Sequence, residues 1–194
     1  MSARALDRTS VGVAPVMLAA WCAIAGAALT MVLGGIPPLA ALEAQTPPPW
    51  WIAALNAMSH LLLIAGVVGL PRAGAAGRGG LGRAGLAATL LGLATLTVAE
   101  VISLVDTDVA IPLFSLATLL MMVGLILLGI AALRSGRWAG WRRFTPLACG
   151  LFIPLVLLPS FAVPPPASNY AVGLWGVCWL LLGLALRAEA TGHA

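Results

Sequence analysis

The sequence predicts an all-α membrane protein: a single domain that forms a compact bundle of six transmembrane helices. Of its 194 residues, 61% are hydrophobic and only 8% are charged, whereas soluble domains carry roughly a quarter charged residues. Six apolar runs are each long enough to cross about 30 Å of hydrocarbon as a helix. The ten basic residues are all arginines, and they fall only in alternate connections between these runs and near the two termini.

The six spans are expected, in order, at residues 12–36, 51–70, 84–105, 111–133, 145–163 and 170–187. A proline-rich link, residues 36–50, separates the first two spans. It cannot continue a helix, although its central part can form a short surface turn, and Glu43 is its only charge. The next link, residues 72–83, is rich in glycine and arginine, which predicts a flexible connection rather than a further domain.

The later helices begin at recognisable capping residues. Residues 106–108 supply N-cap candidates for the fourth span, and Pro112 follows in its first turns. Ser168 and Asn169 are candidates for the cap of the sixth span. These residue types favour helix starts because their side chains accept hydrogen bonds from free backbone N–H groups.

Two features of the spans bear on how they pack. The first span carries small residues at four-residue spacing: Cys22, Gly26, Thr30 and Gly34, with Ala19, Ala23 and Ala27 beside them. Small residues let helices approach closely in lipid, so we expect packing stripes inside one bundle. In the fifth span, Pro154 and Pro159 should bend the helix and free backbone carbonyls.

The arginine pattern also predicts the orientation. Cytoplasmic connections of membrane proteins carry an excess of Lys and Arg. Both termini and the two arginine-rich connections, 72–83 and 134–143, are therefore expected in the cytoplasm, with the protein in the plasma (inner) membrane. Aromatic residues are expected at the two interfaces, where such residues concentrate: Trp50, Trp51, Phe161 and Tyr170 at the outer one, and Trp138, Trp141 and Phe144 at the inner one.

Several functional classes lack their sequence signature. The basic connections lack the spacing and interleaved aromatics of a nucleic-acid site. Cys22, Cys149 and Cys178 all lie within apolar runs, as small core residues do. His60 is the only histidine in an apolar run, because His193 lies in the tail, so haem binding by two histidines and a metal site are not indicated. We expect no cofactor, no metal and no nucleic-acid partner.

Glu100 and His60 are the strongest site candidates, since they are the only acid and the only histidine well inside the spans. Polar groups at such depth normally face the bundle interior or a wet cavity. Counting from the outer helix ends, Asn56 lies roughly 8 Å deep, Glu100 roughly 9 Å and His60 roughly 14 Å. The second and third spans are joined by a short link, so they are predicted to be antiparallel neighbours.

Further polar residues share the helix faces of these two. Asn56 and His60 are four residues apart, and Thr97, Glu100 and Ser103 follow at intervals of three. We predict a polar cluster in the outer half of the bundle, with Glu100 and His60 as catalytic candidates. The ligand-binding candidates are Asn56, Ser59, Thr97, Ser103, Ser115 and Thr118.

Three functional hypotheses follow from this cluster. The first is a non-enzymatic membrane protein, an accessory subunit or a binding protein. The second is a small proton-coupled transporter that uses Glu100 and His60. The third is an intramembrane enzyme that protonates an isoprenoid- or lipid-like substrate through Glu100. The expected partners are the lipid bilayer and either an apolar small molecule or another membrane protein.

Overall fold

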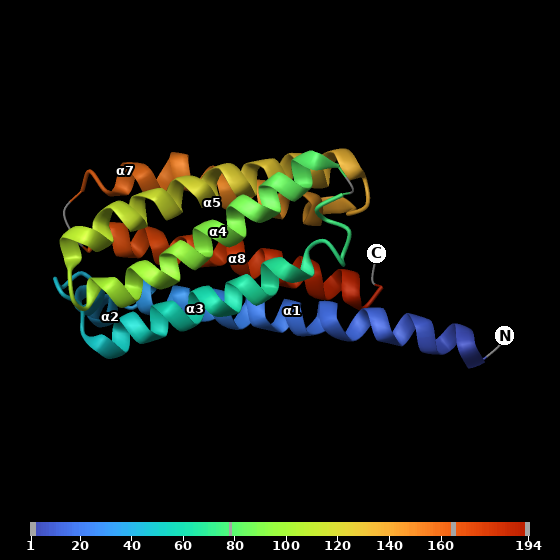
Figure 1. The fold of residues 1–194 in the computed structure, drawn as a ribbon, viewed down its shortest axis with the longest axis horizontal. Helices are drawn as coiled ribbons and strands as arrows, with labels where there is room; N and C mark the ends of the chain where they lie inside the picture. Colours follow the sequence, from blue (N-terminus) through green and yellow to red (C-terminus); the bar gives the residue numbers. More distant parts are fainter. Residues whose placement is uncertain (1–2, 78, 164–165, 193–194) are drawn as a thin grey trace.

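The computed structural model describes residues 3–77, 79–163 and 166–192, with side chains from Val13 onward. Helices make up nearly all of this part of the chain (Figure 1). The α-helices are α1 (Ala3–Gly35), α2 (Pro37–Glu43), α3 (Trp50–Gly69), α4 (Gly80–Ser103), α5 (Thr107–Ser135), α6 (Thr145–Phe152), α7 (Leu158–Ser160) and α8 (Ala167–Ala190). A 3-10 helix, η1 (Gly140–Phe144), precedes α6, and a π-helix, η2 (Ile153–Leu157), joins α6 to α7.

The predicted fold class is confirmed: within the described residues, six helical segments are long and apolar enough to cross a membrane. They are Val13–Gly35, Trp50–Gly69, Gly80–Ser103, Thr107–Ser135, Gly140–Ser160 and Ala167–Ala190. The third segment begins earlier than expected because the glycine-rich link enters the helix at Gly80. The fourth begins at Thr107 because the Asp106 side chain accepts a hydrogen bond of 3.1 Å from the Val109 N–H.

Two expectations about the connections are wrong in detail. The proline-rich link contains a true helix, α2, because Pro37 and Pro38 occupy the first turn, where a missing N–H costs nothing. Ser168 and Asn169 do not cap α8, since this helix already includes them and Pro166 stands at its N-cap.

The six spans form a closed ring. Helix α1 packs against α3 and α8, α4 packs against α3 and α5, and α6 packs against α5 and α8. The predicted pairing of the second and third spans is therefore confirmed. Figure 1 shows the long helices running side by side, with the start of α1 and the end of α8 at the same end of the bundle.

Small residues bring the helix backbones together. A Cβ atom at Gly34 would lie 2.4 Å from the backbone oxygen of Asn169, and one at Gly66 would lie 2.6 Å from the Cβ of Ala23. These contacts join α1 to α8 and to α3. The small residues of the first span therefore pack inside one bundle, as expected for helix association in lipid.

The fifth span departs from α-helical geometry at its prolines. Pro154 lies within η2, and Pro159 lies within the short helix α7. Proline removes a backbone N–H and displaces the preceding turn, which accounts for the irregular segment. The predicted disturbance of this helix is thus confirmed, and it brings Leu157 and Phe161 to the wall of an internal cavity described below.

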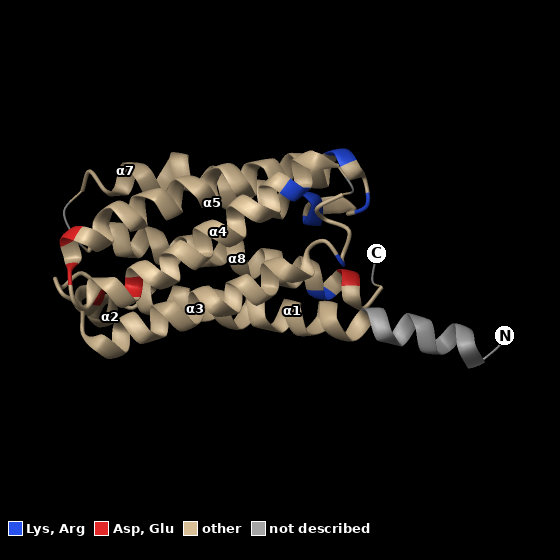
Figure 2. Cartoon of the chain, in the orientation of Figure 1, with Lys and Arg blue, Asp and Glu red and all other residues tan. Residues whose placement is uncertain are grey.

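The described arginines and most of the described acidic residues lie at opposite ends of the bundle (Figure 2). One end, here called the arginine end, holds the described arginines at residues 72, 83, 134, 137, 142, 143 and 187. The opposite end, here called the acidic end, holds Glu43, Glu100, Asp106 and Asp108.

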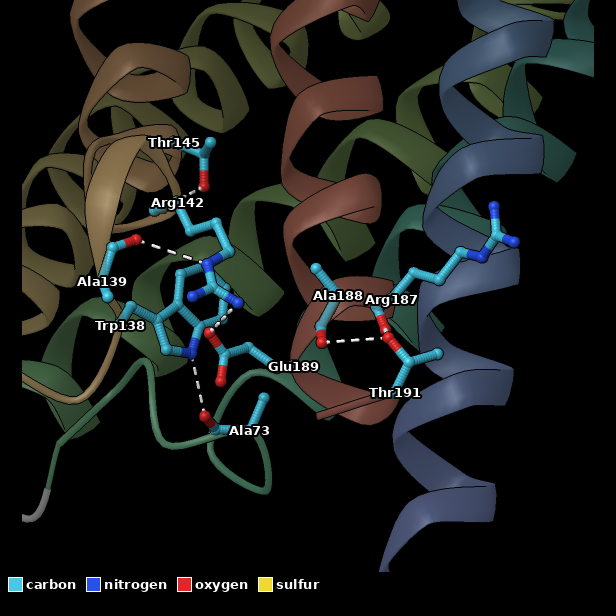
Figure 3. A network of polar contacts seen from close by, with 9 residues as sticks. All are labelled: Ala73, Trp138, Ala139, Arg142, Thr145, Arg187, Ala188, Glu189 and Thr191. Carbon is cyan, nitrogen blue, oxygen red and sulfur yellow. Dashed lines mark hydrogen bonds and ion pairs between the residues drawn. The ribbon is translucent and has the colours of Figure 1, made fainter. Parts of the chain in front are cut away.

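The arginine end is tied together by paired polar groups (Figure 3). Arg142 is buried and forms an ion pair of 2.9 Å with Glu189 near the end of α8. Trp138 is buried beside it and donates its indole N–H to the Ala73 carbonyl, at 2.9 Å. These contacts join the connection 134–143 to the end of the last helix and to the connection 72–83.

Candidate functional site

A cavity of about 340 Å³ lies inside the ring of helices, toward the acidic end. All six spans contribute to its wall, together with the segment around α2. The residues that line it are Thr30, Glu43, Gln45, Thr46, Pro48, Asn56, His60, Leu63, Leu96, Glu100, Ser103, Thr107, Phe114, Thr118, Met121, Leu157, Phe161, Asn169, Val172 and Trp175.

Five of the eight site residues predicted from the sequence line this cavity. They come from three helices: Asn56 and His60 from α3, Glu100 and Ser103 from α4, and Thr118 from α5. Asn56 and His60 face the same side because residues four apart on a helix differ by only about 40° in direction. The structure brings Glu100 and His60 to one cavity, but no hydrogen bond or ion pair joins them among the interactions of the described residues.

The other three predicted residues do not line the cavity. Ser59 is buried against α1, where its hydroxyl lies 3.2 Å from that of Thr30. The Thr97 hydroxyl donates to the Leu93 carbonyl within its own helix. Ser115 is exposed on the outside of the bundle and donates to the Ile111 carbonyl. These hydroxyls are satisfied by helix backbone or by a neighbouring helix, as is common for Ser and Thr in spans.

Glu43 is the main cavity residue that the sequence did not reveal. Oε1 of Glu43 accepts a hydrogen bond of 2.9 Å from the Asn56 side-chain amide. Helix α2 positions this carboxylate because Ala40 is buried and Glu43 follows one turn later on nearly the same face. One sequence feature could have identified Glu43 as a site residue, because it is the only charge in an otherwise apolar short helix.

The environment of Glu43 alters its acidity. Burial raises the pKa of Glu43 above its ordinary value of 4.5, and the amides of Asn169 and Asn56 offset part of that increase. Asn169 also lines the cavity from the first turn of α8.

Within the part of the chain that the structure describes, two polar atoms of the site are buried without a hydrogen-bond partner: Oε2 of Glu43 and Nδ1 of His60. Buried polar atoms without partners are uncommon, since each costs about 1–3 kcal/mol of lost hydration. Such atoms at the wall of a cavity leave hydrogen-bonding capacity for a molecule inside it.

The rest of the wall is apolar and aromatic. Phe114, Phe161 and Trp175 contribute rings from α5, the end of the fifth span and α8. Trp175 is held in place because its indole N–H donates to the Cys149 carbonyl at 2.9 Å. It also contacts Trp179 edge to face, with ring centroids 5.6 Å apart. The two tryptophans are thus buried in the bundle.

No family model, no curated protein sequence and no solved structure matches this chain. The site must therefore be interpreted from its own geometry. The described residues contain no group of three or more His, Cys, Asp or Glu side chains that could hold a metal ion. The arrangement has polar atoms grouped at one end of an apolar, ligand-sized cavity, which suits a small molecule with a polar head and an apolar body.

Proposed function

We propose that this protein is a non-enzymatic binding protein of the plasma membrane that holds a small amphipathic molecule in the cavity at its acidic end. The observation that carries the proposal is a cavity of about 340 Å³ in which Glu43 and His60 present unpartnered polar atoms beside aromatic walls. Ligand pockets usually occupy about 300–1,000 Å³ and combine an apolar lining with a few placed polar groups.

The arrangement of charge supports an orientation with the arginine end in the cytoplasm. Positively charged residues are retained on the cytoplasmic side during insertion, and the described arginines gather at one end of the bundle (Figure 2). Both chain termini then lie in the cytoplasm, and the exposed cavity residues Gln45 and Thr46 lie on the outer side.

Close packing beyond the cavity favours binding over transport. Leu125, Trp179 and Leu182 are each at most 1% exposed and fill the bundle on the arginine side of the cavity. The ion pair between Arg142 and Glu189 lies farther along the same route. A transporter needs this region to open, and a well-packed core resists such rearrangement.

A binding role accounts for Glu100 and His60 without requiring them to act as a catalytic pair. A general acid or base must lie within hydrogen-bonding reach of the proton that it transfers on a bound substrate. Both side chains line the same cavity, where they can contact a ligand directly.

The test is ligand-dependent stabilisation of the full chain in lipid nanodiscs. A set of cationic, neutral and anionic amphipathic compounds is screened by thermal unfolding, because a ligand that binds the folded state raises its stability. We expect at least one compound class to raise the melting temperature of the wild type but not that of Thr118→Phe, which fills the cavity.

The matched control is Leu119→Phe, which places the same ring on a neighbouring residue that is 50% exposed. This variant should respond like the wild type. Equal stabilisation of Thr118→Phe and wild type, or no stabilisation by any class, contradicts the proposed function.

A further inference from the structure

The charge of the cavity wall is one-sided. Glu43 and Glu100 both line the cavity, and no arginine or lysine is among its lining residues. Glu43 and Glu100 share the wall of one cavity, so a negative charge on either carboxylate acts on the other. Two buried like charges repel each other strongly because the protein interior screens them weakly. A cation placed beside both carboxylates would relieve this repulsion.

The protein leaves acceptor capacity on these carboxylates. Asn56 donates to Oε1 of Glu43 and the Asn169 amide also acts on this carboxylate, while Oε2 makes no hydrogen bond within the described residues. Nδ1 of His60 is likewise buried and unpartnered. An ammonium group carries three N–H donors and no acceptor, so it matches the free carboxylate oxygen, and Nδ1 of His60 can accept a further hydrogen bond in the tautomer that is protonated at Nε2.

The surrounding surface fits an organic rather than an inorganic cation. Phe114, Phe161 and Trp175 line the same cavity, and aromatic faces attract ammonium groups as well as apolar bodies. A bare metal ion requires several ligands around one point, and no such group of side chains occurs in the described part of the chain.

We propose that the cavity binds an organic ammonium ion with an apolar body, whose charged head contacts Glu43 and Glu100 and whose body lies against Phe114, Phe161 and Trp175. This inference rests on the proposed function, that the cavity takes a small molecule, and adds the chemical class of that molecule.

The experiment compares three probes of similar size and different charge: 2-phenylethylammonium, 2-phenylethanol and 3-phenylpropanoate. Binding to the full chain in nanodiscs is measured by titration calorimetry, and empty nanodiscs correct for partition into lipid. We expect the ammonium to bind at least about tenfold more tightly than the alcohol, since hydrogen bonds to ionised groups are the stronger ones. The carboxylate should bind least.

Glu43→Gln separates charge from hydrogen bonding, because the Gln side chain keeps an oxygen that can accept from Asn56. It should weaken ammonium binding by about tenfold and change alcohol binding by less than about twofold. Glu100→Gln should have the same selective effect. The matched control is Asp108→Asn, which removes one exposed charge at the same end of the bundle without altering the cavity wall.

The outcomes distinguish this inference from the proposed function. If alcohol and ammonium bind equally and Thr118→Phe abolishes both, the cationic ligand class is wrong while binding in the cavity stands. If Asp108→Asn weakens ammonium binding as much as Glu43→Gln, only the general field at the acidic end acts, and the assigned contact is wrong. If none of the probes binds, the inference fails, and the broader compound set decides the proposed function.

Discussion

The two ends of the bundle treat buried charge in opposite ways. At the arginine end, Arg142 is paired with Glu189 at 2.9 Å, and Trp138 donates to the Ala73 carbonyl. At the acidic end, Glu43 and Glu100 line a cavity whose described wall holds no arginine or lysine, and Oε2 of Glu43 has no hydrogen-bond partner among the described residues.

Under the proposed function, this difference separates the polar groups that stabilise the fold from those that would contact a ligand. A buried charge with an internal partner is already compensated, so it holds elements together. A buried charge without one destabilises the empty protein unless a proton or a bound molecule compensates it. Depth in the bundle alone does not distinguish the two, and a missing partner does so only at a cavity wall, since Nε1 of Trp179 is also buried without one.

The largest expected effect concerns the orientation of the two ends. Two cysteine variants probe the two ends: Thr46→Cys at an exposed residue of the cavity wall, and Ser135→Cys at the arginine end. An impermeant maleimide applied to intact cells should label the first variant and not the second, after correction for the native cysteines. Labelling of Ser135→Cys alone would reverse the proposed topology.

Breaking the pair at the arginine end should cost the most stability. Arg142→Met leaves the Glu189 carboxylate without its partner, which should lower the free energy of unfolding by about 3 kcal/mol. The double variant with Glu189→Leu should recover most of this loss, because no unpaired charge remains. The free energy of unfolding of both variants is measured in detergent. If the single and double variants lose equal stability, the unpaired Glu189 carboxylate is not the cause of the loss.

The pH dependence of stability should reveal the acidic end. Because burial raises the pKa of Glu43 in the folded state, its contribution to stability is fully present below the ordinary value of 4.5. That contribution is lost as pH rises through the raised pKa, by at most about 1.4 kcal/mol per pH unit. Glu100 and His60 face the same cavity and also titrate. Unfolding measured across pH should show a shallower decline in Glu43→Gln than in the wild type.

The smallest effect is expected from neutralising the acidic end at neutral pH. Glu43→Gln keeps the acceptor for Asn56 and removes an unpaired charge, so the ligand-free protein should gain up to about 1 kcal/mol of stability. Thermal unfolding without ligand checks this. A loss comparable to that of Arg142→Met would show that Glu43 serves the fold in the same way as the pair at the arginine end.

Much of the candidate site was predictable because helix periodicity is local. Asn56 and His60 share a face through their four-residue spacing, and Glu100 lies at matching depth on the neighbouring helix. The predicted site also included residues whose side chains do not face the cavity. Ser59 is about 100° from His60 around α3, and each step of three residues along Thr97, Glu100 and Ser103 turns the direction by about 60°. Thr97 therefore falls outside the cavity that Glu100 and Ser103 reach.

The six spans and their charge pattern follow from the amino-acid sequence without knowledge of the fold. In hydrocarbon every backbone polar group must be satisfied within the chain, which leaves helices as the outcome for these apolar runs. Tertiary structure alone decided how each helix is rotated about its axis, because that depends on close contacts such as Gly34 with the backbone of α8. The tertiary structure also places α2 at the end of the ring, where Glu43 accepts a hydrogen bond from Asn56. No local sequence pattern predicts that these two residues are in contact.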